Sequence, residues 1–247
     1  MARILVTNDD GVRSQGLRAL VDALGPLGEV VVVAPQEETS AIGHALTLQR
    51  PLRLEKLQDG WYAVDGTPTD CVNVAIAHVL HGLPELVVSG INLGLNLGDD
   101  VTYSGTVSGA LEGALFGAPA VACSVDGRRD AWQFGPAADV SARIARAVLT
   151  HGLPPRMLLN VNVPSGEPRG LRVTSQGNRQ HGSIVAKQID PRGRPYYWIG
   201  MSDDHWVPDI RSDVQAVRDG LVSVTPLQSD MTAYSALEKA ERLSREF

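Results

Sequence analysis

The stretch Arg3-Ile4-Leu5-Val6-Thr7-Asn8-Asp9-Asp10-Gly11 begins as an apolar run and ends in two adjacent acids. Its apolar half is typical of a strand buried on both faces, as in a parallel sheet covered by helices. Adjacent strand residues point to opposite faces, so both carboxylates converge only if the chain leaves strand geometry here, which Gly11 makes easy. Converging carboxylates suit Mg²⁺ or Mn²⁺, which prefer oxygen ligands. The alternative is an Asx turn in which Asp10 caps the next helix.

The alternation that starts at this strand continues through residue 165. Short β-branched runs alternate with helical stretches, which predicts a Rossmann-like, doubly wound and mostly parallel α/β sheet with its ligand site beyond the carboxyl ends of the strands. Residues 46–64 interrupt this alternation of strands and helices, and their pattern predicts an inserted β-hairpin. We expect core strands at Arg3 to Thr7, Glu29 to Ala34, Leu86 to Ser89, Ala120 to Ser124 and Leu158 to Val163; helices at Gly16 to Leu24, Pro68 to Leu80, Thr106 to Phe116 and Ala137 to His151; and hairpin strands at Thr47 to Leu54 and Gly60 to Val64, turning at Gln58-Asp59-Gly60.

The amino-acid composition of the chain changes after Pro164. Residues 166–197 hold six Lys or Arg against two acids, and Tyr196, Tyr197 and Trp198 follow one another. This segment is too polar for a core of its own and too aromatic for a disordered tail, so we expect a β-rich arm that packs on a neighbouring subunit. A strand at Leu221 to Pro226 and a helix at Ser235 to Arg245 should follow. We therefore predict a metal- and phosphate-binding core over residues 1–165 and a C-terminal oligomerisation part over residues 166–247.

Composition narrows the classes of function. The chain has 247 residues and a net charge of −6, which argues against a nucleic acid polymer as the main partner. Cys71 and Cys123 are the only cysteines, and their apolar surroundings predict reduced, buried thiols. No secretory leader or membrane-length apolar run is present, so we expect a cytoplasmic protein with no membrane partner.

A dinucleotide-binding site is the obvious competitor for such a fold. No G-x-G-x-x-G follows the first strand, and the second strand ends in Val33-Ala34-Pro35 without the acid that would bind a ribose. Two acids where the pyrophosphate should rest would also repel it. The sequence therefore disfavours this class.

Three further segments at predicted strand or helix ends carry polar groups. In the segment Thr39 to His44, Ser40 could complete a metal shell. His44 could contact phosphate or act as an acid, although such residues are more often turn and structural residues. In the segment Ser89 to Gly98, glycines at 90, 94 and 98 let backbone amides approach a ligand, and Asn92 and Asn96 add neutral polar groups. In the third, Ser104 or Thr106 should cap a helix whose N-terminus also forms an anion site.

Taken in order, these motifs resemble the SurE family of survival-protein-E nucleotidases. The resemblance covers nearly the whole chain and extends beyond the segments above. It is carried by Thr7-Asn8-Asp9-Asp10-Gly11, Ser40 with Gly43-His44-Ala45, Gly66-Thr67-Pro68 with Asp70-Cys71-Val72, Ser89-Gly90-Ile91-Asn92, Tyr103-Ser104-Gly105-Thr106-Val107, Asn160-Val161-Asn162-Val163-Pro164, Gly193-Arg194-Pro195-Tyr196-Tyr197-Trp198 and Ser223-Val224-Thr225-Pro226-Leu227.

The resemblance implies a metal-dependent phosphatase that removes 5′- or 3′-phosphates from nucleoside monophosphates and in some members trims polyphosphate. It implies one Mg²⁺ or Mn²⁺ per subunit and a C-terminal arm exchanged within a dimer or tetramer. By matching positions, the metal ligands would be Asp9, Asp10, Ser40 and Asn92; the phosphate pocket would be Asn96, Ser104, Gly105 and Thr106; and the catalytic residues would be Asp9, Asp10 and Asn96.

Two departures and two rival functions accompany this resemblance. Ala41 stands where many members have Gly, and Arg211-Ser212-Asp213 stands where Gly-Thr-Asp is usual, so both loops are expected to differ locally. Deacetylases of the PIG-L type also carry Asp-Asp after the first strand, but they need a preceding His-Pro and a zinc-binding histidine, and here Thr7-Asn8 precedes the pair. A nucleotide sensor without catalysis is the other rival.

Overall fold

The computed structural model describes residues 1–127, 133–179, 183–201 and 206–244. Its strands are β1 (Ala2–Thr7), β2 (Gly28–Pro35), β3 (Leu54–Gln58), β4 (Trp61–Val64), β5 (Leu86–Leu93), β6 (Ala120–Val125), β7 (Met157–Val163), β8 (Leu171–Val173), β9 (Ser183–Ile189), β10 (Pro195–Met201) and β11 (Val222–Gln228). Its α-helices are α1 (Gln15–Leu24), α2 (Pro68–Val74), α3 (Gly105–Phe116), α4 (Phe134–His151), α5 (Asp213–Arg218) and α6 (Leu237–Ser244). All five predicted core strands and all four predicted core helices are present.

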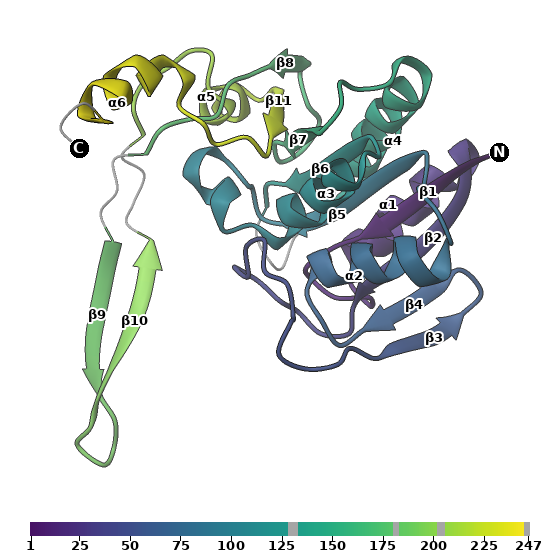
Figure 1. Ribbon diagram of the computed structural model, residues 1–247, viewed down its shortest axis with the longest axis horizontal. Helices are drawn as coiled ribbons and strands as arrows, with labels where there is room; N and C mark the ends of the chain where they lie inside the picture. The colour runs from purple at the N-terminus through teal and green to yellow at the C-terminus, as the bar shows by residue number, and fades with distance from the viewer. Residues whose placement is uncertain (128–132, 180–182, 202–205, 245–247) are drawn as a thin grey trace.

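Nine strands form the central sheet in the order β3-β4-β2-β1-β5-β6-β7-β11-β8 (Figure 1). Strands β4 to β7 in this order run parallel, β3 is antiparallel to β4, and β11 is antiparallel to β7. The predicted mostly parallel α/β fold is thus confirmed. From β1 the chain adds β2, β3 and β4 on one side and, starting at β5, the other strands of the central sheet on the opposite side. The carboxyl ends of β1 and β5 are therefore the switch point, where such sheets bind ligands.

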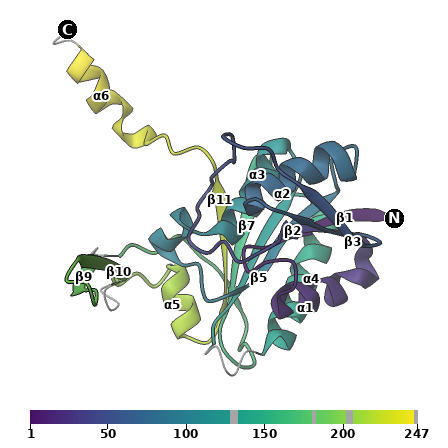
Figure 2. The ribbon, with the colours of Figure 1, turned by 90° about the horizontal axis from the view of Figure 1, so that it is seen from below.

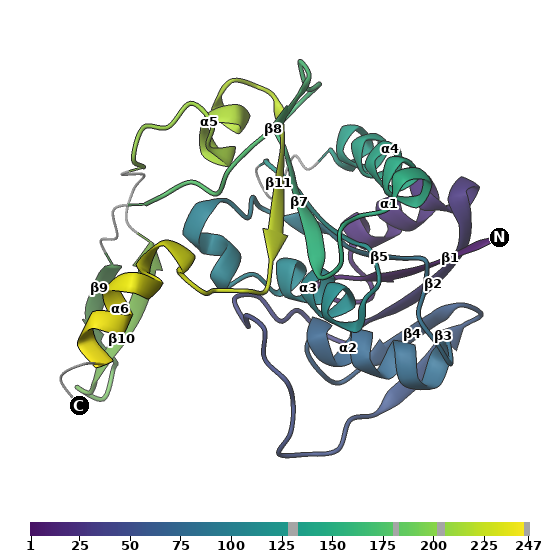
Figure 3. The ribbon, with the colours of Figure 1, turned by 45° about the horizontal axis from the view of Figure 1, so that its top comes forward.

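Helices cover both faces of the sheet, α1 and α4 on one face and α2 and α3 on the other (Figure 3). In β1, Ile4 and Val6 pack in the first core while Leu5 packs in the second, and all three are fully buried. This two-sided burial explains why the core strands read as continuous apolar runs rather than as alternating ones.

The inserted hairpin differs from its prediction at its first strand. Its turn is as expected, with Gly60 at φ 72°, but the strand starts at Leu54, so the prediction of Thr47 to Leu54 was wrong. The backbone of the segment before Leu54 is occupied elsewhere: Thr47 donates its amide to Asp70 Oδ1 at 2.9 Å, and Pro51 has no amide hydrogen for a sheet ladder. Similarly, the predicted helix Pro68 to Leu80 is α-helical only to Val74 and continues as a π-helix over Ala75–Val79.

Some strands of the C-terminal part belong to the central sheet and others do not. Strands β11 and β8 extend the sheet, so it continues across residue 165, and the division of the chain there stays a prediction. In contrast, β9 and β10 pair only with each other among the described residues and project from the body, as α6 also does (Figures 1 and 2). The predicted helix to Arg245 is described to Ser244, and Arg245 lies outside the described residues.

Two smaller expectations can be compared with the structure. Cys71 and Cys123 are buried and free, as predicted, and burial raises the pKa of the Cys123 thiol to about 12. Within the described ranges, no helix is both long enough and apolar enough to cross a membrane.

Candidate functional site

Asp9 lies just beyond β1, at the switch point, against the start of α3. Its side chain is almost fully buried, with 5% of the residue exposed. The hydroxyl of Thr106 donates to Asp9 Oδ1, and a Cβ added at Gly105 would lie only 2.8 Å from the Cβ of Asp9. Only glycine therefore lets the helix start approach the carboxylate this closely. The predicted acid and the predicted phosphate-binding turn are in direct contact.

The charge of Asp9 is poorly compensated. Burial raises the pKa of this carboxyl group above its usual value of 3.8, hydrogen bonds from the Thr106 hydroxyl and from the backbone of Asp9 and Thr106 oppose this rise without cancelling it, and nearby Glu38 adds to it. Among the described residues, no Lys, Arg or His forms an ion pair with Asp9. A buried carboxylate without a cationic partner is costly, so a divalent cation would stabilise this arrangement.

Asp10 contacts the end of the neighbouring strand, β5. The amide of Leu93, at the end of β5, donates to Asp10 Oδ2 at 3.2 Å. The chain leaves strand geometry after Thr7 as predicted, because Asn8 Nδ2 donates to the carbonyl of Gly11 at 3.1 Å and Gly11 takes a φ of 92°. Ser14 caps α1, so the alternative in which Asp10 caps that helix is wrong.

Asn92 lies on β5, and Ser40 lies in the loop after β2. Asn92 Nδ2 donates to the carbonyl of Gly94 at 2.8 Å, which leaves its side-chain oxygen as the candidate ligand. Ser40 is exposed, and its hydroxyl donates to Glu38 Oε1 at 2.7 Å. The preceding Thr39 donates its amide to the carbonyl of Asp9 at 2.8 Å. The backbone at 39 is therefore anchored to the site, while the Ser40 hydroxyl gives its proton to Glu38 and keeps its oxygen lone pairs for a ligand role.

The residue after Ser40 shows why the family departure at this position matters. Ala41 adopts a φ of 56°, in the left-handed region that glycine enters at no steric cost. For alanine this conformation costs about 1 kcal/mol. The loop therefore keeps the glycine-like backbone although alanine stands at this position. At the second departure, Ser212 caps α5 through the amide of Gln215.

Asn96 belongs to a buried amide cluster that the sequence did not reveal. Its side-chain nitrogen donates to Ser124 Oγ at 2.8 Å, and its carbonyl accepts from Asn160 Nδ2 at 2.8 Å and from Asn162 Nδ2 at 3.0 Å. The only signal in the sequence is the alternation of two asparagines within an apolar strand, which places both on one face. The cluster holds the loop after β5 firmly against β6 and β7.

Two of the three glycines expected to let backbone approach a ligand, Gly90 in β5 and Gly98 in the segment after it, serve protein packing. A Cβ at Gly90 would lie 2.4 Å from the carbonyl oxygen of Cys123, and one at Gly98 would lie 2.4 Å from the ring of Trp206. The close approach expected towards a ligand is thus, at these two positions, an approach to neighbouring parts of the chain.

The start of α3 has the predicted capping. Ser104 accepts the amide of Val107 at 3.0 Å and is the N-cap, whereas the Thr106 hydroxyl is used by Asp9. The N-terminus of α3 offers backbone amides and a favourable dipole to an anion. As it stands, that position is already occupied in part by the Asp9 carboxylate.

The predicted ligands suit a hard divalent cation by their chemistry. Asp9, Asp10, Ser40 and Asn92 supply oxygen only, the donor set that Mg²⁺ and Mn²⁺ prefer. Across the described residues, no group of three or more His, Cys, Asp or Glu side chains could hold a metal ion. The predicted set contains only two such side chains, so an ion here would depend on the hydroxyl, the amide and water for its other ligands.

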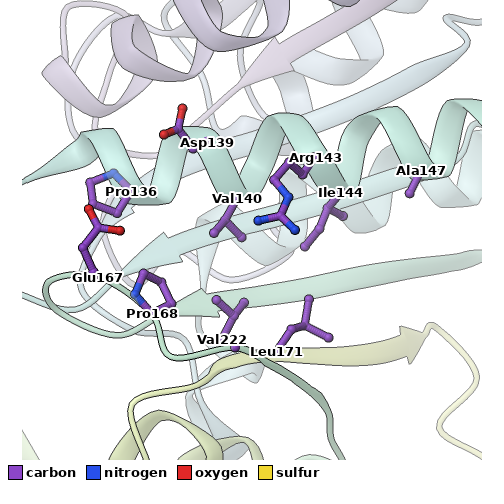
Figure 4. A pocket seen from close by; sticks show the side chains of 11 residues that line it. Pro136, Asp139, Val140, Arg143, Ile144, Ala147, Glu167, Pro168, Leu171 and Val222 are labelled. Carbon is purple, nitrogen blue, oxygen red and sulfur yellow. The ribbon is translucent and has the colours of Figure 1, made fainter.

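A hollow lies apart from the candidate site. A groove of about 470 Å³ runs between α4 and the strands β8 and β11. Figure 4 shows Val140, Ile144 and Leu171 among its apolar walls, with Arg143 beside them. None of the predicted site residues lines it, so it is separate from the candidate site.

The fold and the site together define a Rossmann-like α/β protein whose switch point combines two carboxylates with the N-terminus of a helix. The family model described as survival protein SurE matches residues 4–183, and the chain belongs to the SurE family.

Several relatives support this membership. The 5′-nucleotidase SurE of Syntrophotalea carbinolica is 51% identical, with 98% of this chain and 97% of that protein aligned. The 5′-nucleotidase SurE of Myxococcus xanthus is 53% identical over 95% of this chain and 90% of that protein. The crystal structure of the SurE protein from Aquifex aeolicus superposes with a TM-score of 0.88 at 44% identity, covering 98% of this chain and 99% of that one.

Proposed function

We propose that this chain is a divalent-metal-dependent 5′-nucleotidase. It would hydrolyse nucleoside 5′-monophosphates, and also 3′-monophosphates, to nucleoside and phosphate, with short polyphosphate as a further substrate. The observation that carries the proposal is the buried, poorly compensated Asp9 in contact with the start of α3, in a chain about half identical to curated 5′-nucleotidases over nearly its full length.

Each part of the site has a role in this proposal. Asp9, Asp10, Asn92 and Ser40 would hold one Mg²⁺ or Mn²⁺. When bound, such an ion supplies charge neutralisation for the phosphate and lowers the pKa of water. The amides and hydroxyls of residues 104–106 would bind the phosphate oxygens as their charge redistributes. Asn96, anchored by Ser124, would orient the phosphate, and one of the two aspartates would accept the proton of the attacking water.

The deciding experiment measures phosphate release from AMP with and without EDTA. We expect release with Mg²⁺ or Mn²⁺, loss with EDTA, and recovery when the metal is returned in excess. No metal-dependent release from any nucleoside monophosphate would rule out the proposal and leave the nucleotide-sensor alternative. A panel of 5′- and 3′-mononucleotides and short polyphosphates would then rank the substrates.

The setting of the enzyme belongs to the same proposal. We place it in the cytoplasm as a self-associated dimer or tetramer, formed through the projecting arm of β9 and β10. The support for this assembly is the set of large apolar side chains that the arm leaves exposed, namely Val185, Ile189, Tyr196, Tyr197, Trp198 and Ile199.

Removing the hydroxyl of Thr106 should lower kcat by about 10- to 100-fold, the range found for partners that orient a metal ligand. The reason is that this hydroxyl orients the Asp9 carboxylate. The variant Thr106→Val would be compared with Thr106→Ser, which keeps the donor and should retain most activity, in AMP hydrolysis at saturating Mn²⁺.

Thr69→Val is a matched control for this substitution. Thr69 is equally buried, but its hydroxyl has no hydrogen-bond partner among the described residues, so activity should be unchanged. Equal rates for Thr106→Val and the unmodified chain would show that the hydroxyl does not serve catalysis.

A further inference from the structure

A buried acid outside the predicted site links two of its parts. Glu112 lies on α3 with 7% of the residue exposed. Its Oε2 is 2.7 Å from Nε2 of His44, and its Oε1 accepts a hydrogen bond of 2.6 Å from Nδ2 of Asn73 on α2. His44 is thus a hydrogen-bonded residue, and both carboxylate oxygens of Glu112 are engaged.

His44 belongs to a long loop that carries a predicted metal ligand. Residues 36–53, here called the 36–53 loop, contain no helix or strand. Before Ser40, the loop is anchored by the amide of Thr39 on the carbonyl of Asp9 at 2.8 Å. After Ser40, it is anchored by the amide of Gly43 on the carbonyl of Tyr103 at 2.9 Å and by the His44–Glu112 contact. Ser40 therefore lies between two anchors, and the second anchor is made with α3 and the residue before its cap.

Burying Glu112 costs free energy, and packing alone does not explain why an acid stands at this position of α3. The rest of α3 is mostly small or apolar, as in Ala110, Leu111, Gly113 and Ala114. A buried acid must lose its hydration, and an apolar residue of similar size is often at least as stable in such a position. An acid that satisfies donors from α2 and from the 36–53 loop instead fixes the position of the loop relative to the helix.

We propose that Glu112 is a positioning residue that, through His44, holds the 36–53 loop in register with the start of α3. In this arrangement Ser40 and the phosphate-binding turn 104–106 keep a fixed relative position. The inference rests on the proposed function, because it assigns Ser40 to the metal site. Glu112 would therefore influence metal affinity without contacting metal or substrate.

The test compares four variants of the full chain. Glu112→Leu and His44→Phe each break the contact. Glu112→Gln keeps it, because the amide can accept from Asn73 and donate to a neutral His44. Asn73→Leu is the matched control, since it removes the other partner of Glu112 and leaves the 36–53 loop untouched. Thermal melting of all four identifies any variant that fails to fold.

Two measurements report the position of the loop. Hydrogen exchange of the amides at 39–46 in the metal-free protein should speed up by about tenfold or more in Glu112→Leu and His44→Phe, because these amides exchange through local opening. The Kd for Mn²⁺, measured by calorimetry, should rise by about tenfold in the same two variants. AMP hydrolysis at saturating Mn²⁺ should keep its kcat within about threefold, and Glu112→Gln should behave like the unmodified chain.

The double variant Glu112→Leu with His44→Phe distinguishes a shared role from two separate ones. If the pair acts as one contact, its effect on the Kd should equal that of a single variant. Unchanged exchange and unchanged Mn²⁺ affinity in Glu112→Leu, or equal effects in Asn73→Leu, would overturn the positioning role. If the unmodified chain failed to bind Mn²⁺ at all, the proposed function itself would fail, and the exchange rates would still show whether Glu112 orders the loop.

Discussion

Replacing Asp9 by asparagine should abolish AMP hydrolysis, with a loss of at least about 10³-fold, and should leave the fold intact. Groups that stabilise charge in a transition state each contribute about 10²–10³ in rate, and this substitution also removes a proposed metal ligand. The fold should survive because the amide oxygen of the new side chain can still accept the hydrogen bond from Thr106. Phosphate release with Mn²⁺, together with Mn²⁺ binding by calorimetry, measures both effects.

The same substitution should raise the melting temperature of the metal-free protein at pH 7. Burial raises the pKa of Asp9 above 3.8, so between its unfolded and folded pKa values the folded chain binds more protons than the unfolded one. The stability of the metal-free protein therefore falls as pH rises through this window. The asparagine side chain carries no charge and avoids the loss. The advantage of the variant should be present at pH 7 and shrink as the pH is lowered towards 4, where Asp9 of the unmodified chain becomes protonated.

Asp59→Asn is the control for both measurements, because it makes the same chemical change at a fully exposed turn acid. Its activity should match the unmodified chain. Two results would contradict the role given to Asp9: retained turnover in Asp9→Asn, or global unfolding of that variant, which would mark Asp9 as a structural residue.

The parts of the fold that follow from local pattern were predictable. β1 and the other core strands are buried on both faces, so each reads as an apolar run, and their parallel order follows from the helices between them. Asp9 and Asp10 were found because two acids directly after such a strand have few structural explanations. The hydrogen bond between Asp9 and Thr106 was not predicted, since it joins residues 97 positions apart.

The parts that depend on long-range partners were not predictable. The segment that begins at Thr47 has the composition of a strand, yet the amide of Thr47 donates a hydrogen bond to Asp70. Glu112 was missed because one acid in a helix is normally an exposed one, and only the fold shows that it is buried beside His44. The direction of the Ser40 hydroxyl was not predictable either, because an irregular loop has no periodic pattern that fixes which way each side chain points.

Removing the projecting hairpin should convert the assembled protein into single chains. The hairpin exposes aromatic and branched apolar side chains, among them Ile199 at 83%, Ile189 at 67% and Trp198 at 64%, and an isolated pair of strands is marginally stable in water. Exposed apolar patches of this kind mark interaction surfaces. Since Ser183 pairs with Met201 across the two strands, residues 184–200 can be replaced by a short Asn-Gly turn.

Light scattering coupled to size-exclusion chromatography measures the outcome of this deletion. The unmodified chain should elute at a multiple of 26.4 kDa, and the deletion variant at the mass of one shortened chain. Trp198→Ser combined with Ile199→Ser should weaken the assembly in the same direction while keeping the chain length. The control is Leu54→Ser with Leu57→Ser, on the other hairpin, whose apolar side chains are less exposed and whose loss should not change the mass. A deletion variant that keeps the mass of the unmodified chain would show that other surfaces hold the subunits together, and α6 would be the next segment to remove.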